Sequence, residues 1–147
     1  MCDAISVRTF VTFEAQFADD AVWDRRDNCI VPGGKGIACT IREALMAHVT
    51  DCSVVRSHSF YGWAFDVSIG KCRFVCIIQY PGPWLLICEK EDTSLLEKLW
   101  RRTHDERLAA AVNAVHVVLT NDPRFTAVQW FTREEYERGA TRGAATP

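Results

Sequence analysis

The chain has 147 residues, of which 48% are hydrophobic and 24% are charged, and its formal net charge is −2. This length suits one domain with a sizeable core, and this composition excludes an intrinsically disordered chain. The balanced charge gives no electrostatic reason to expect a nucleic-acid partner, because phosphate binding needs a basic face. No stretch approaches the roughly twenty apolar residues of a membrane span, so we expect no membrane partner.

The N-terminus lacks the basic-then-apolar order of a secretory signal. The chain contains seven cysteines, an odd number that disfavours an extracellular disulfide framework. Several of them lie inside apolar runs, for example Cys76 and Cys88, where a free thiol behaves as a small hydrophobic group. We therefore expect mostly reduced core thiols and a cytoplasmic protein.

The first predicted element is a strand over residues 6–17, in which apolar and polar side chains alternate. An acidic segment follows and is expected to form a loop; it contains Asp19, Asp20, Asp24 and Asp27. The glycine-rich run PGGKG at residues 32–36 then leads into a predicted helix. Its apolar residues recur at every fourth position and so line one face: Ile37, Ile41, Leu45 and Val49. A short strand is expected around residues 53–57.

The centre of the chain, residues 61–90, predicts an antiparallel meander of three strands, of which the second covers residues 72–80. Tyr61, Trp63, Phe65 and Val67 alternate with smaller or polar residues, as in a half-buried strand. The pattern is broken at two expected turns, Ile69-Gly70 and the run PGP at residues 81–83, because glycine tolerates positive φ and proline cannot continue a ladder.

The C-terminal part predicts two helices, a strand and a short helix. Ser94 with Glu97 fits a capping box, and a second helix is expected over residues 104–119, ending before Asp122 and Pro123. A last strand is predicted over residues 125–131. Thr132 with Glu135 fits another capping box, which indicates a short final helix.

This order of elements predicts an α+β fold. We expect a single domain over residues 1–138, with an antiparallel meander sheet of about five to six strands packed in two layers with three main helices. Residues 139–147 are small and polar and are expected to form a disordered tail.

The glycine-rich run is the nearest approach to a phosphate motif. Exposed amides at a helix N-terminus attract an anion, so Gly33, Gly34, Lys35 and Gly36 form a candidate anion-binding site. The run lacks the spacing of a P-loop, and a plain turn into the helix is the alternative. The four histidines are scattered and no catalytic set converges in the sequence, so we predict no metal, no cofactor and no catalytic residues.

Two functions remain open. The first is a non-enzymatic protein-binding module, comparable in size and architecture to bacterial toxin-neutralising immunity proteins and secretion chaperones. The helix over residues 108–119 is apolar nearly all round except for Asn113 and His116, which suggests a partner or self-association surface. With Asp19, Asp20, Asp24 and Asp27 these residues form the candidate partner surface, which would suit a basic partner. The alternative is a small enzyme or ligand-binding domain with an aromatic pocket formed by His58, Tyr61 and Trp63.

Overall fold

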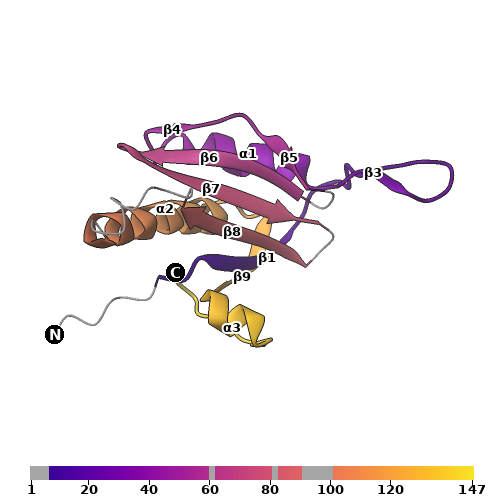
Figure 1. The fold of residues 1–147 in the computed structure, drawn as a ribbon. Coiled ribbons are helices and arrows are strands. Elements are labelled where there is room, and N and C mark those ends of the chain that lie inside the picture. Colours follow the sequence, from indigo (N-terminus) through magenta and orange to yellow (C-terminus); the bar gives the residue numbers. More distant parts are fainter. Residues whose placement is uncertain (1–6, 60–61, 81–82, 91–100) are drawn as a thin grey trace.

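The computed structural model describes residues 7–59, 62–80, 83–90 and 101–147, and it has mixed helix and strand structure (Figure 1). Seven strands form one antiparallel sheet in the order β4-β6-β7-β8-β1-β9, and β5 also pairs with β6. The strands of this sheet are β1 (Phe10–Ala15), β4 (Asp51–Cys52), β5 (Arg56–His58), β6 (Gly62–Ile69), β7 (Cys72–Gln79), β8 (Trp84–Lys90) and β9 (Phe125–Phe131). The predicted α+β class is confirmed.

The predicted meander forms the middle of the sheet as β6, β7 and β8. Its register places Trp63 opposite Ile78, Phe65 opposite Cys76, and Cys76 in turn opposite Cys88. These side chains are buried. Along β7 they alternate with more exposed residues, which is the period-two pattern of a strand, whereas residues 62–65 of β6 and 85–88 of β8 are buried at consecutive positions. The described cysteines are free thiols, and four of them are buried: Cys52, Cys72, Cys76 and Cys88.

Two helices pack on the sheet face that carries Trp63 and Cys76. Helix α1 (Lys35–Leu45) buries Ile37, Ile41 and Leu45 of the predicted apolar stripe, and it ends before Val49, the fourth predicted member. Helix α2 (Arg101–Asn121) contacts α1 as well as strands β6 to β9, so it is buried on more than one side, as its apolar sequence requires. Figure 1 shows both helices behind the sheet. The helix start predicted at Ser94 lies outside the described residues.

The third helix, α3 (Arg133–Glu137), begins at the predicted capping box: Thr132 accepts a hydrogen bond from the Glu135 amide, and the Glu135 carboxylate accepts one from the Thr132 amide. The Tyr136 ring lies 5.2 Å from the ring of Phe10. Phe10 belongs to a small second cluster with Leu85, Ile87 and Phe131. Since Phe10 and Val11 are neighbours on a strand, they point to opposite faces, so this cluster lies on the face away from α1 and α2. The predicted two-layer packing is therefore not confirmed.

The N-terminal half contains structure that the sequence does not predict. The segment expected to be an acidic loop includes a two-stranded hairpin outside the main sheet, formed by β2 (Val22–Trp23) and β3 (Cys29–Val31). The short strand expected around residues 53–57 is instead two short strands, β4 and β5. We call residues 22–31 the arm, because Figure 1 shows them projecting from the body of the molecule.

The C-terminal segment pairs with β9. The amide of Ala144 donates to the Trp130 carbonyl, and the amide of Trp130 donates to the Ala144 carbonyl, both at 2.8 Å. The Gly143 amide also donates to Oε1 of Gln129 at 2.8 Å. Residues 143 and 144 thus have defined hydrogen bonds in a segment whose composition predicts a disordered tail.

Candidate functional site

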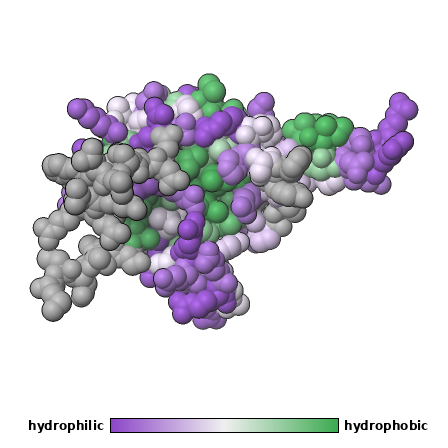
Figure 2. All heavy atoms as spheres, viewed as in Figure 1, coloured by the Kyte–Doolittle hydropathy of each residue, from purple (hydrophilic) through white to green (hydrophobic). Residues whose placement is uncertain are grey.

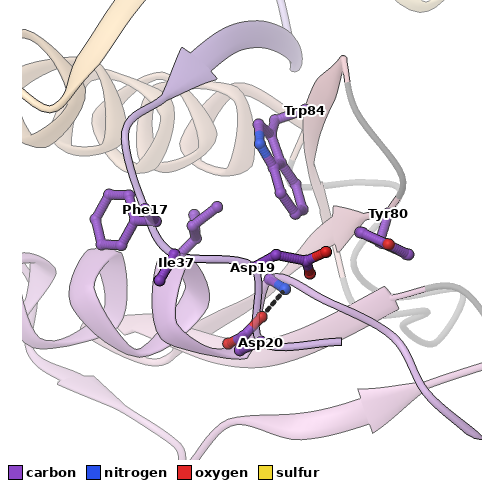
Figure 3. A pocket seen from close by; sticks show the side chains of 8 residues that line it. Phe17, Asp19, Asp20, Ile37, Tyr80 and Trp84 are labelled. Atoms are coloured by element: carbon purple, nitrogen blue, oxygen red, sulfur yellow. Dashed lines mark hydrogen bonds between the residues drawn. The ribbon is translucent and has the colours of Figure 1, made fainter. Parts of the chain in front are cut away.

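A concave site of about 310 Å³ lies at the base of the arm, and we call it the basal cleft. Four elements meet there: the segment after β1, the start of α1, the residue after β7 and the start of β8. Its lining residues are Phe17, Ala18, Asp19, Asp20, Gly34, Ile37, Tyr80 and Trp84. Figure 3 shows the aromatic rings of Tyr80 and Trp84 on one side and the carboxylate of Asp19 directed toward them.

Asp20 caps helix α1 from a distant part of the sequence. Its Oδ1 accepts a hydrogen bond from the Gly34 amide at 2.7 Å, and its Oδ2 accepts one from the Gly36 amide at 2.8 Å (Figure 3 draws the first). Helix N-terminal amides carry partial positive charge and attract a carboxylate. The structure thus places a carboxylate of the chain itself on the predicted anion-binding loop, and an external anion would have to displace it.

The two glycines before α1 allow the backbone to lie directly against the aromatic rings. A Cβ atom on Gly33 would be 2.8 Å from the Tyr80 ring, and one on Gly34 would be 2.7 Å from the Trp84 ring. Gly34 also has φ of 100°, a conformation that favours glycine. The Tyr80 and Trp84 rings lie 5.8 Å apart between centroids. The glycine-rich run is therefore explained by this close packing.

The loop is also anchored to Trp63. The indole Nε1 of Trp63 donates to the Pro32 carbonyl at 3.0 Å, and the Lys35 ammonium lies 5.4 Å from the centroid of the same indole. Lys35 therefore contacts an aromatic face rather than the cleft carboxylates. Within the part of the chain that the structure describes, neither Asp19 nor Asp20 forms an ion pair with a cationic side chain.

The cleft is electronegative, because Asp19 and Asp20 line it and none of its described lining residues is cationic. The pKa of Tyr80 is raised, first by desolvation and then by the charges of Asp19, Cys29 and Asp20. Oδ1 of Asp19 accepts a hydrogen bond from the Ala21 amide at 3.0 Å, which holds this carboxylate at the cleft. Two carboxylates beside two aromatic rings can bind a cationic group, because the ring faces and the carboxylates both attract positive charge.

The turn of the arm is organised by Asp24. Its Oδ1 accepts from the amides of Arg26 (2.7 Å) and Asn28 (2.9 Å), and its Oδ2 accepts from the Asn28 side-chain amide at 3.0 Å. Hydrogen bonds from the Asn28 side chain, then from the two amides, lower the pKa of Asp24. Asp27 adopts a positive φ of 60° in the same turn. Asp24 is thus a structural residue of the arm.

The arm exposes apolar side chains. Val22, Trp23 and Ile30 are 49%, 51% and 60% exposed. Figure 2 shows apolar surface along the arm beside its hydrophilic tip. The tip is not acidic overall, because Arg25 and Arg26 balance the charges of Asp24 and Asp27. The negative charge of the predicted acidic segment is therefore concentrated at the base, on Asp19 and Asp20.

The other part of the predicted partner surface lies elsewhere, on α2. Nδ1 of His116 accepts a hydrogen bond from the indole Nε1 of the fully buried Trp130 at 3.0 Å. His116 thereby has a structural partner, while Asn113 is exposed. Both residues line a second concave site of about 330 Å³ together with Val7, Ala109, Val112, Thr146 and Pro147.

The structure does not bring together the residues of the predicted aromatic pocket. Trp63 pairs with Ser57, and His58 pairs with Gly62. Since paired residues share a face and neighbours on a strand alternate, the side chains of His58 and Trp63 lie on opposite faces of the sheet. Tyr61 lies outside the described residues.

Sequence reasoning missed Phe17, Tyr80 and Trp84 as cleft residues. A signal for two of them was present, because Tyr80 and Trp84 flank the predicted turn at residues 81–83 and the ends of a tight hairpin lie close together.

Among the described residues, no group of three or more His, Cys, Asp or Glu side chains could hold a metal ion. No described helix has the length and apolar character needed to cross a membrane. Comparisons of the chain with known proteins find no matching family model, no similar curated protein and no similar solved structure.

Proposed function

We propose that this chain is a protein-binding module that contacts its partner through the arm and the basal cleft. The observation that carries the proposal is the exposure of Trp23, Val22 and Ile30 on an arm outside the main sheet. A two-stranded hairpin is marginally stable by itself, so its large apolar side chains gain little from folding. They gain more by burial against another protein, where tryptophan is enriched among the residues that dominate binding energy.

The cleft supports the same proposal from its charge. Asp19 and Asp20 lie at the point where the two arm strands join the body, so a partner that covers the arm also meets these carboxylates. Complementary charge at such a surface steers association and selects partners. A toxin-neutralising immunity protein or a secretion chaperone would use a surface of this kind against a partner that presents cationic side chains.

Site-specific photocrosslinking tests the proposal. A photoreactive phenylalanine analogue replaces Trp23, and in a matched control it replaces Tyr136, an exposed aromatic residue of α3. In an extract of the source cells, we expect the probe at position 23 to crosslink a discrete protein, a second copy included, and the probe at position 136 not to do so.

Competition with chain that carries no photoreactive group measures whether that adduct is specific. Excess unlabelled chain should abolish it, whereas a chain carrying Trp23→Ser and Ile30→Ser should compete poorly. The proposal fails if position 23 yields no discrete adduct, or if the two competitors act equally.

A further inference from the structure

We infer that the partner of the arm is a second copy of this chain, bound by reciprocal exchange of arms, so that an arginine at the tip of each arm enters the basal cleft of the other protomer. This inference rests on the proposed function and names the partner. The resulting dimer has a two-fold axis, and its interface is self-complementary because each protomer gives one tip and one cleft.

Charge complementarity is the first argument. Arg25 and Arg26 are exposed at the tip of the arm, and the described part of the chain offers neither of them an ion-pair partner. At the base, Asp19 and Asp20 have no cationic partner either. The tip therefore carries two arginines that form no ion pair with its own carboxylates, Asp24 and Asp27, and the base carries two carboxylates without a cationic partner among the described residues.

The shape and chemistry of the cleft are the second argument. A cleft of about 310 Å³ suits a single long side chain rather than a folded element. Arginine combines a planar guanidinium that stacks on aromatic faces with N–H donors that match a carboxylate. Tyr80 and Trp84 supply the rings. Asp19 supplies the carboxylate, because both oxygens of Asp20 already accept hydrogen bonds from the start of α1.

The geometry of the arm is the third argument. Arg25 lies five positions after Asp20 in the sequence, and in extended backbone this corresponds to roughly 16 Å. The tip of an arm thus points away from its own cleft. When two arms lie side by side in opposite directions, each tip reaches the base of the other. The same arrangement brings the exposed apolar side chains of the two arms together. A single interface would therefore bury both the apolar side chains of the arms and the carboxylates of the basal clefts.

A charge exchange between two variants tests the inference. One variant carries Asp19→Arg, which places an arginine in the cleft where the arginine of an incoming tip would bind. The other carries Arg25→Asp and Arg26→Asp, so its cleft and its tip are both negative. Each variant alone should be monomeric in sedimentation analysis, since the tip of one copy would then meet a cleft of like charge in the other copy. An equal mixture should form a heterodimer, because each cleft then meets a tip of opposite charge.

Milder variants measure the size of the effect. Asp19→Asn keeps an acceptor for the Ala21 amide and removes only the charge, so the fold is retained. We expect it to raise the dissociation constant of the dimer by about tenfold or more, as for other close charge pairs at interfaces. Added salt should also weaken the dimer. The matched control is Arg138→Asp, which changes an exposed arginine directly after α3 and should leave the dissociation constant unchanged.

Three outcomes overturn the inference: a parent chain that is monomeric at every soluble concentration, a dimer indifferent to the arm and cleft variants, or a mixture of the two charge variants that stays monomeric although both are folded by circular dichroism. Crosslinking from position 23 shows whether only the second copy is wrong as the partner or whether the proposed function is wrong as well. A monomeric chain that still crosslinks a different protein there keeps the proposed function and excludes the second copy.

Discussion

Gly34 decides how closely the start of α1 can lie against the Trp84 ring. We expect Gly34→Ala to lower the free energy of unfolding by about 2–5 kcal/mol, since positive φ costs about 1–2 kcal/mol and overpacking adds a further 1–3 kcal/mol. Urea denaturation measures the change. Gly139→Ala is the matched control, because Gly139 has φ of 74° but no atom within 4 Å of its added Cβ. Equal losses in the two variants would show that contact with Trp84 has no energetic weight.

His116 serves the core through one hydrogen bond. His116→Ala would leave the indole N–H of the fully buried Trp130 without its acceptor, and an unsatisfied buried donor costs about 1–3 kcal/mol. His116→Asn offers a side-chain oxygen near the position of Nδ1 and should recover part of the loss. Thermal or urea unfolding monitored by tryptophan fluorescence measures both. If the two variants are equally destabilised, the hydrogen bond is not what His116 contributes.

We expect the folded protein to lose stability in alkaline solution because of the buried thiol of Cys76. Its hydrogen bond with Cys88, followed by burial, raises the pKa of the Cys76 thiol well above its ordinary value. The unfolded chain therefore releases this proton at lower pH than the folded chain does. The free energy of unfolding is therefore unaffected by the titration of this thiol below the pKa of the unfolded thiol, about 8.5. As pH rises from there toward the pKa of the folded thiol, the free energy of unfolding falls by about 1.4 kcal/mol per pH unit.

The measurement is urea unfolding of the parent and of Cys76→Ala between neutral and alkaline pH. The variant loses some stability at every pH because it leaves a cavity, so the slopes are compared rather than the values. The parent should lose stability more steeply than the variant above about pH 8.5. Parallel curves would contradict the raised pKa of Cys76.

At the scale of elements, the register between β7 and β8 can be tested through Cys76 and Cys88, which lie opposite each other on these strands. The amide of Cys88 donates to the Thr9 carbonyl at 3.0 Å, so its backbone polar groups face β1 and not β7. Cys76 and Cys88 therefore form a non-hydrogen-bonded pair, in which side chains lie closest and Cα atoms are about 4.5 Å apart. This spacing is within the range of a disulfide.

We expect slow oxidation of the native protein by diamide to join Cys76 to Cys88. Each thiol gives up one hydrogen, the S–S bond forms, and diamide is reduced to the hydrazine. Peptide mapping by mass spectrometry identifies the pair, and Cys88→Ala is the control that should abolish it. A predominant disulfide between Cys76 and any other cysteine would show that the register of these strands differs.

Elements with a local pattern could be predicted from the sequence. The last strand has the predicted bounds, Phe125–Phe131, because its limits are set by Pro123 on one side and the Thr132 cap on the other. The arm could not be predicted, since β2 and β3 have two and three residues and are too short to show a period. The cleft was only partly predictable, because the contact of Asp20 with Gly34 joins residues fourteen apart in the sequence.

At the scale of the whole molecule, the arm and the body have separate roles. The buried core consists of side chains from the main sheet, α1 and α2, with further contacts under α3, and the arm contributes only the half-buried Val31 to it. The stability of the domain should therefore be independent of the arm, whereas association should depend on it. A shortened chain makes this separation measurable.

In that chain, residues 23–30 are replaced by Asn-Gly, a two-residue sequence that favours a tight hairpin turn between the paired Val22 and Val31. We expect its free energy of unfolding to stay within about 1 kcal/mol of the parent, because the removed side chains are almost all exposed. Sedimentation analysis should show a monomer. The full-length chain with Trp23→Ser and Ile30→Ser, which keeps the turn of the arm, should show intermediate association. If the shortened chain no longer unfolds cooperatively, the arm is part of the folding unit, and its exposed tryptophan no longer indicates a binding surface.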